Sequence, residues 1–351
     1  MSEVNFNELF GNFSAADALA ATETQKNQGF YGNADLFKPS IRDEKCKDQN
    51  YRALIRFIPF YHEGKWRTTI CRWECFLKDV NGDNGIFVVS PKTANQKCPM
   101  RALSYKLYTS ESAIDKANSK KIQVYQQYYA LIEVVKDVQH PEYDGKIFIY
   151  QFGQKVNDKI ESAMTSTEFT DGFNPFDLYD GRLFEINLTK DTKKMDNDKT
   201  VTNYDACRFI EKTAPIHFYV DNGGEEKTRM TLLADDRETQ KAFFNWLEKD
   251  APKIKEYFWK EWDSETTAKV NKNLATYSSG YVAPRTTVAE AKEAVENATK
   301  STPQPQPVQT EPEEVPGDMP DFTGADVKIP EDNSTSVSTD DDDWINSVLN
   351  S

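Results

Sequence analysis

Two apolar runs near the middle of the chain indicate its fold: Tyr128-Tyr-Ala-Leu-Ile-Glu-Val-Val-Lys-Asp137 and Lys146-Ile-Phe-Ile-Tyr-Gln-Phe-Gly153. The first run is rich in β-branched and aromatic residues. In the second, three aromatic side chains occupy alternate positions and therefore share one face of a strand. Asp144-Gly145 between the runs is a strong signal for a hairpin turn. This stretch therefore predicts an antiparallel β-hairpin.

Similar short runs on both sides of the hairpin predict further strands. They cover residues 52–59, 64–73, 85–90, 177–188, 217–220 and 229–233. Turn residues between short strands favour a small barrel or sandwich. Helices are expected over residues 13–21, after Pro99, and over residues 237–262 with a break at Pro252.

The net charge of −14 is unevenly distributed over the 351 residues. Segment 301–351 carries twelve acidic residues and one lysine, and segment 1–37 carries five acidic residues and one lysine. The rest of the chain is nearly neutral and can present one basic face. Residues 301–339 are rich in Pro, Glu, Thr and Ser, a composition that predicts disorder because it cannot bury enough apolar surface.

Composition excludes several classes of protein. No run of 18 or more apolar residues exists, so no membrane-spanning helix is expected. The N-terminus lacks the pattern of a secretory signal. The five cysteines are an odd number and widely scattered, which favours a reduced cytosolic protein.

Catalytic motifs are missing from the sequence. There is no phosphate-binding glycine loop, no Gly-x-Ser-x-Gly elbow and no His-Glu-x-x-His, so we do not expect an enzyme. A metal-dependent nuclease stays open as an alternative because carboxylates are abundant. Cys71, Cys75, Cys98 and His62 could in principle hold zinc, but their spacing favours ordinary thiols without a metal.

Basic and aromatic residues alternate in several segments, which is the pattern that binding to single strands needs, since bases stack on rings and phosphates pair with cations. The candidate residues are Arg52, Arg56, Lys65, Trp66, Arg67, Arg72, Trp73, Lys120, Lys121, Tyr125, Tyr128, Tyr129, Tyr150 and Lys155. The alternative is that the aromatic residues build a β-barrel core and the cations only solvate its surface.

The order of several blocks resembles a known family. Besides the strand at 52–59 and the predicted hairpin, the blocks are Gln154-Lys-Val-Asn-Asp-Lys-Ile160, Asn174-Pro-Phe-Asp177 and Asn203-Tyr-Asp-Ala-Cys-Arg-Phe209. Together with the Asp-rich end, they are similar to the helix-destabilising single-stranded-DNA-binding proteins of T-even bacteriophages. The likeness covers roughly residues 45–210 and the terminus.

The resemblance implies a β-rich α+β fold. Its core is an OB-fold, a five-stranded Greek-key barrel with an embedded subdomain, followed by a helical C-terminal extension and a disordered acidic tail. The implied organisation is an N-terminal arm (1–40), a DNA-binding core (41–282) whose helical extension covers about 237–275, a disordered linker (283–339) and an acidic interaction peptide (340–351).

The resemblance also implies roles for single residues. Arg56 is expected to contact phosphate, Tyr128 and Tyr129 to lie beside the bases, and Tyr150 and Tyr204 to do the same. Lys155 matches a basic residue of the same groove, and Arg208, in the matching block 203–209, is a further candidate for contact with nucleic acid.

Three departures from the family have consequences. The family holds zinc through a His and three Cys, but Cys98-Pro-Met-Arg101 lacks the last Cys, so we expect no cofactor, with Cys98 the one clear remnant. The family's basic stretch becomes Gln123-Val-Tyr-Gln-Gln127, which predicts weaker or less salt-sensitive binding. The N-terminus is acidic where the family has a basic arm for contacts between neighbours, which leaves self-association along DNA open.

The acidic peptide at the C-terminus is expected to recruit partners. Its candidate residues are Asp340, Asp341, Asp342, Asp343, Trp344, Ile345, Val348 and Leu349. The resulting prediction is a protein that coats and protects single-stranded DNA in phage replication, recombination and repair, in the cytoplasm of the infected bacterium. It would bind replication and recombination proteins through the tail. The alternative from another class is an acidic DNA-mimic adaptor.

Overall fold

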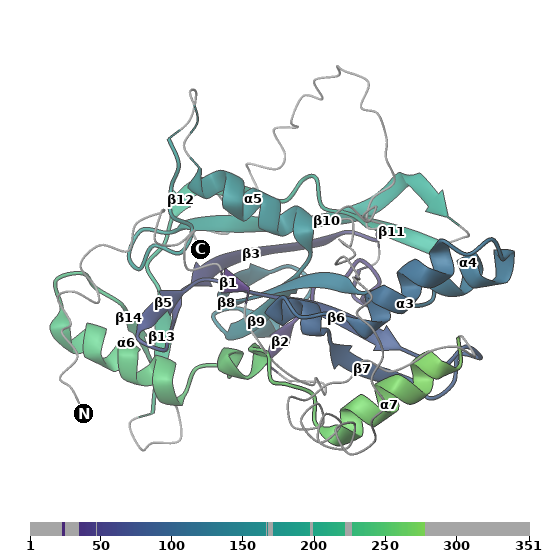
Figure 1. The fold of residues 1–351 in the computed structure, drawn as a ribbon. Coiled ribbons are helices and arrows are strands. Elements are labelled where there is room, and N and C mark those ends of the chain that lie inside the picture. The colour runs from purple at the N-terminus through teal and green to yellow at the C-terminus, as the bar shows by residue number, and fades with distance from the viewer. Residues whose placement is uncertain are drawn as a thin grey trace, which may run out of the picture.

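The computed structural model describes residues 23–24, 35–46, 48–165, 167, 171–196, 199–221 and 227–277. The architecture is mixed α+β and rich in strands, with five α-helices in these ranges (Figure 1). The predicted helix at 13–21, the linker at 283–339 and the peptide at 340–351 lie outside them.

A ten-stranded sheet forms the body of the described part. Its strands are β1 (Glu23–Thr24), β2 (Leu36–Phe37), β3 (Tyr51–Ile58), β6 (Ile70–Leu77), β7 (Ile86–Val89), β8 (Tyr125–Asp137), β9 (Ile147–Phe152), β10 (Arg182–Asp196), β11 (Lys199–Asn203) and β12 (Arg208–Thr213). The long strand β8 is antiparallel to β3, β6 and β9. The predicted hairpin is therefore confirmed as β8–β9, and its turn contains η2 (Pro141–Tyr143) and Gly145 with a φ of 74°.

Both faces of β8 are buried. Ala130 and Ile132 enter one core cluster, whereas Tyr129 and Leu131 enter a second on the opposite face, as the two-residue period requires. Helix α5 (Gln154–Met164) covers the first cluster, and α6 (Arg237–Lys249) covers the second (Figure 1). This double burial explains why the run is apolar at almost every position.

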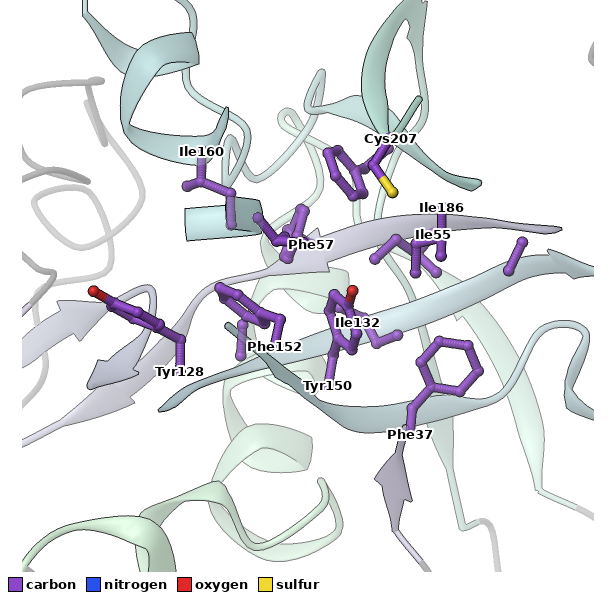
Figure 2. Packing of buried hydrophobic residues seen from close by; sticks show 14 of the residues in the cluster. Phe37, Ile55, Phe57, Tyr128, Ile132, Tyr150, Phe152, Ile160, Ile186 and Cys207 are labelled. Carbon is purple, nitrogen blue, oxygen red and sulfur yellow. The ribbon is translucent and has the colours of Figure 1, made fainter. Parts of the chain in front are cut away.

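A row of aromatic rings runs through the first core cluster (Figure 2). Tyr128 stacks on Phe152 with ring centroids 5.7 Å apart, and Phe152 lies 5.0 Å from Tyr150. Phe37 continues the row at 5.8 Å from Tyr150. Phe37 belongs to residues 35–46, which we call the N-terminal strap, and β2 within this strap pairs with β9. The strap is therefore packed onto the sheet.

The second and third clusters attach the remaining elements. The hairpins β4 (Phe60–His62)–β5 (Lys65–Arg67) and β13 (His217–Val220)–β14 (Thr228–Thr231) join α6 and η3 (Ile254–Tyr257) in the second. The third contains β6, β7, α3 (Pro99–Tyr108) and α7 (Ser264–Ala275). Nearby are η1 (Pro91–Ala94) and α4 (Ala113–Ser119), which contacts α3.

Two predicted strands differ from the observed ones. The run at 64–73 is divided, because β5 ends at Arg67 and β6 begins at Ile70. The strand expected from Asp177 begins only at Arg182. The Asp177 carboxylate accepts hydrogen bonds from the amides of Tyr179 and Asp180, and these bonds hold a turn instead. Among the helices of the described ranges, none has the length and apolar character needed to cross a membrane.

Candidate functional site

A groove of about 530 Å³ lies beside the aromatic row and is named here the central groove. Five segments and the strap form its walls: β6, the start of β8, β9, the first turn of α5, and the end of β11 with the residue that follows. The lining residues are Lys38, Pro39, Trp73, Tyr125, Gln126, Gln127, Tyr150, Gln151, Phe152, Gly153, Gln154, Lys155, Val156, Thr202 and Tyr204. Segments far apart in the sequence thus converge on one site.

Five predicted site residues meet in the central groove: Trp73, Tyr125, Tyr150, Lys155 and Tyr204. Tyr125 is 44% exposed, and Trp73 and Tyr204 are half-buried, so these three rings can offer a face to a planar ligand. Tyr150 is only 1% exposed and forms the floor. Burial raises the pKa of Tyr125 and Tyr204, so both phenols stay neutral and do not repel an anion.

Trp73 is held in a fixed position at one end of the groove. Its amide donates a 2.8 Å hydrogen bond to Thr93 Oγ1. Lys92 Nζ lies 3.3 Å from the centroid of the indole, and the Arg101 guanidinium lies 5.6 Å from it. Because Lys92 occupies one face of the ring, a stacking ligand would use the other.

The electrostatic character of the central groove is moderately positive. Lys38 and Lys155 are its charged lining residues, and no carboxylate lines it within the described ranges. The groove also includes the start of α5, where Gly153 supplies no capping side chain. A helix N-terminus without a side-chain cap presents free amides to an anion. The site therefore suits a ligand that combines flat rings with negative charge.

Glutamines make up much of the polar lining. Gln126 Nε2 donates to the Tyr128 hydroxyl at 2.7 Å, and that hydroxyl donates to Gln154 Oε1 at 2.7 Å. Such amides can bind bases or phosphates without adding charge. Sequence reasoning missed them because it searched for cations and rings. It also missed Lys38, which it placed in an N-terminal arm; the strand-like Leu36-Phe37 before it was the available signal.

Two arginines expected on the binding surface lie in the interior, which corrects that expectation. Arg56 is 0% exposed and donates to the carbonyl oxygens of four residues. These acceptors are in Phe57, Pro175, Asp177 and Ala214. Burial lowers the pKa of Arg56 to about 10, so the group remains charged at neutral pH.

Arg72 is also buried, and its charge is compensated inside the protein. It pairs with Glu74 and lies over the rings of Tyr129 and Tyr257 at 4.7 and 4.9 Å. Neither Arg56 nor Arg72 can reach a surface ligand from these positions.

The predicted pair Tyr128 and Tyr129 is divided between the two faces of the sheet. Tyr128 is 4% exposed and lies directly beside the central groove, bonded to two groove glutamines. Tyr129 is 1% exposed, and its hydroxyl donates to Glu74 Oε1 at 2.6 Å. The two rings therefore cannot stack on neighbouring bases together.

The other candidates lie outside the central groove. Lys65, Trp66 and Arg67 belong to β5, and Trp66 packs against Tyr61 at 5.5 Å. Arg52 and Arg208 both pair with the buried Glu185. Lys120 and Lys121 are exposed between α4 and β8.

The cysteines and histidines do not form the zinc site that the resemblance describes. No group of three metal-ligating side chains converges in the part of the chain that the structure describes. Cys98 Sγ instead accepts hydrogen bonds from the amide of Arg101 and from Ser90 Oγ. Arg101, which replaces the fourth ligand, lies near Trp73. The donor set present therefore does not fit zinc.

Comparisons with known proteins agree with the sequence motifs. Residues 49–222 match the family described as gp32 DNA binding protein like. The chain is 27% identical over 187 residues to the "Single-stranded DNA-binding protein" of Enterobacteria phage T4, covering 47% of this chain and 52% of that one. It is 24% identical over 229 residues to the protein of the same name in Enterobacteria phage T2, covering 59% and 65%. The matches thus span between half and two thirds of these relatives, and the resemblance to T-even phage proteins is confirmed.

Proposed function

We propose that this chain, whose residues 49–222 are gp32-like, binds single-stranded DNA in the central groove. The observation that carries the proposal is the convergence of Trp73, Tyr125 and Tyr204 with Lys38 and Lys155. Stacking on an aromatic ring contributes about 1–3 kcal/mol per base and tolerates any sequence. The two lysines and the start of α5 would bind the backbone phosphates.

An OB-fold barrel is part of the proposal. It is supported by the way β3, β8, β9 and β10 surround one core that α5 covers. We propose that residues 41–282 form the DNA-binding core. The arm (1–40) precedes it, and the linker (283–339) and acidic peptide (340–351) follow it. A crystal structure with a bound oligonucleotide would test the fold and these boundaries together; strands that do not close around the first cluster would contradict the barrel.

The proposed biological role is to coat and protect single-stranded DNA during replication, recombination and repair in an infected bacterium. Its DNA-binding part is supported by the similarity to the single-stranded DNA-binding proteins of phages T4 and T2. We propose that the protein catalyses no reaction. Incubation of a labelled strand with Mg²⁺ tests this point, since cleavage would favour the nuclease alternative.

Tryptophan-fluorescence titration with poly-dT tests the groove. We expect Tyr125→Ala to weaken binding by about fivefold or more, the loss of one stacked base. Tyr108→Ala is the matched control, because Tyr108 is 39% exposed on α3 and does not line the groove. Equal affinity of both variants and the unchanged protein would contradict the proposed site. Binding to basic proteins without any binding to poly-dT would favour the DNA-mimic adaptor.

The acidic peptide 340–351 is proposed to compete with DNA and to recruit replication and recombination proteins when DNA is bound. Its four aspartates resemble a phosphate backbone in charge, and Trp344, Ile345, Val348 and Leu349 offer an apolar surface. Deletion of residues 340–351 should tighten DNA binding and abolish partner capture. Unchanged affinity together with unchanged capture would reject this role.

A further inference from the structure

A second hollow of about 500 Å³ lies along α5 and meets the central groove. We call it the α5 hollow. Lys155 lines both cavities, and Asp205, which lines the hollow, directly follows Tyr204 of the groove. Helix α5, Phe173 and the start of β12 form its walls. A ligand that extends beyond the groove would therefore enter this hollow by passing Lys155.

Phe173 gives the α5 hollow a fixed aromatic surface. Its amide donates to the Ala163 carbonyl at 2.8 Å, which ties it to the end of α5. The Arg182 guanidinium lies over the ring at 4.1 Å, and Phe209 packs edge-on at 5.3 Å. The half-buried ring is thus held by two neighbours while it lines the hollow. A fixed ring loses little conformational entropy when it stacks on a base.

Cations line the same hollow, and the contacts that hold Lys155 and Lys159 there are exposed to solvent. Lys155 and Lys159 are four residues apart and therefore lie on one face of α5. Lys155 Nζ is 3.2 Å from Asp205 Oδ1, and both side chains are more than half exposed. Such an exposed pair contributes little stability. Lys159 Nζ donates to the Asp205 carbonyl oxygen at 3.2 Å.

The carboxylate of Asp205 lies where a backbone phosphate of a bound strand would lie in our proposal. It lies between two lysines of α5, at the passage from the central groove to the α5 hollow. A backbone phosphate could replace its carboxylate at Lys155 and gain Lys159 as a second partner. Asp158 also lines the hollow and opposes an anion there, so the cations exceed the acids only modestly.

We infer that a DNA strand bound in the central groove continues over Lys155 into the α5 hollow, where Lys159 binds a phosphate and Phe173 stacks on a base. This inference rests on the proposed function and deepens it. It makes the site longer than the central groove, and it assigns Asp205 as a carboxylate that a phosphate displaces.

Oligonucleotide length separates the two cavities in an experiment. We would measure the affinity of a thymidine tetramer and of a dodecamer for the full chain and for Phe173→Ala, Lys159→Gln and Asp205→Asn. The tetramer is expected to occupy the groove alone, so Phe173→Ala and Lys159→Gln should bind it as tightly as the unchanged protein does. Phe173→Ala should weaken dodecamer binding by about fivefold or more. Lys159→Gln should reduce the magnitude of the salt slope for the dodecamer by about 0.7, the contribution of one phosphate contact with a single strand.

Asp205→Asn should tighten dodecamer binding, because the phosphate no longer competes with a carboxylate at Lys155. Lys116→Gln is the charge-matched control: Lys116 is exposed on α4 and lines neither cavity. Unchanged dodecamer affinity in all three hollow variants, or equal losses at both lengths, would overturn the inference. If Tyr125→Ala also leaves both lengths unaffected, the proposed function itself fails, so the two failures are distinguishable.

Discussion

Arg56 lies in the interior and supports the fold there, although the sequence predicts that it binds phosphate. Its guanidinium is enclosed by backbone, and a Cβ at Gly181 would collide with it. We expect Arg56→Met to lower the free energy of unfolding by about 3 kcal/mol or more, because several carbonyl groups lose a charged donor. Chemical denaturation measures this change, with Lys146→Gln, an exposed lysine, as the control. If Arg56→Met leaves the stability unchanged and lowers DNA affinity tenfold, Arg56 contacts phosphate as the sequence predicts.

His140 links the N-terminal strap to the β8–β9 turn. Its Nε2 is 3.0 Å from Asp43 Oδ2, and its Nδ1 is 3.0 Å from Glu142 Oε1 and 3.2 Å from Lys45 Nζ. Burial opposes charge on the ring, but hydrogen bonds to Glu142 and Asp43 outweigh it and raise the pKa of His140 above 6.5. A raised pKa in the folded protein means that protonated His140 stabilises the fold below pH 6.5.

This stabilisation should disappear as the pH rises from 6.5 through the raised pKa. We expect the difference in Tm between the unchanged protein and His140→Gln to be larger at pH 5.5 than at pH 8.5. Thermal unfolding followed by circular dichroism at both values measures it. A difference that grows with pH would show that His140 acts in its neutral form.

Among the predicted site residues, Trp73, Tyr125, Lys155 and Tyr204 line the central groove, and their role in binding stays a prediction. The prediction failed at Arg56, because the carbonyl acceptors of Pro175 and Ala214 are more than a hundred positions away in the chain. No local pattern distinguishes a cation with such partners from one that solvates a surface.

At the scale of elements, α7 packs against β6, β7 and α3 and bonds to the β6–β7 turn. Val270 and Leu274 are fully buried in the third core cluster, against β6, β7 and α3. Asn273 Nδ2 donates to the carbonyl oxygens of Leu77 and Asn84, and Thr276 Oγ1 accepts from the amide of Val80. A helix nearly two hundred residues later thus holds the β6–β7 turn.

We expect Asn273→Ala to destabilise the protein by about 1–3 kcal/mol, because it leaves buried carbonyl groups without a donor. A chelator such as EDTA should leave the Tm unchanged in the same experiment. Thermal unfolding and metal analysis of the purified chain measure both effects. Stoichiometric zinc, or a Tm that falls when the chelator is added, would contradict the expectation that the chain binds no metal.

Elements with strong local patterns could be predicted from the sequence. The apolar run at 128–137, the Asp144-Gly145 turn and the start of a helix after Pro99 are such patterns, and β8, β9 and α3 correspond to them. The division of β5 from β6 was missed because Thr68 and Thr69 are typical strand residues. The attachment of α7 could not be predicted, since it depends on contacts with carbonyl groups of a distant turn.

For the molecule as a whole, charge predicts the salt dependence of binding. Two lysines line the central groove and Lys159 lies in the α5 hollow, whereas glutamines supply much of the remaining polar lining. The slope of log K against log[salt] should therefore be shallow, about −1.4 to −2.1 for two to three contacts, because each phosphate contact with a single strand contributes about −0.7. Titrations with poly-dT at several salt concentrations measure it. A slope several times steeper would mean that cations outside these cavities bind the strand.

The most direct measurement of where DNA binds is photo-crosslinking of a bromodeoxyuridine oligonucleotide to the full chain, followed by peptide mapping. The account predicts crosslinks at the exposed Tyr125 or at the half-buried rings of Trp73 and Tyr204 in the central groove. Trp66, on the separate β4–β5 hairpin, is the internal control and should remain unmodified. Crosslinks at Trp66 with none in the groove would contradict the central claim that this groove is the DNA-binding site.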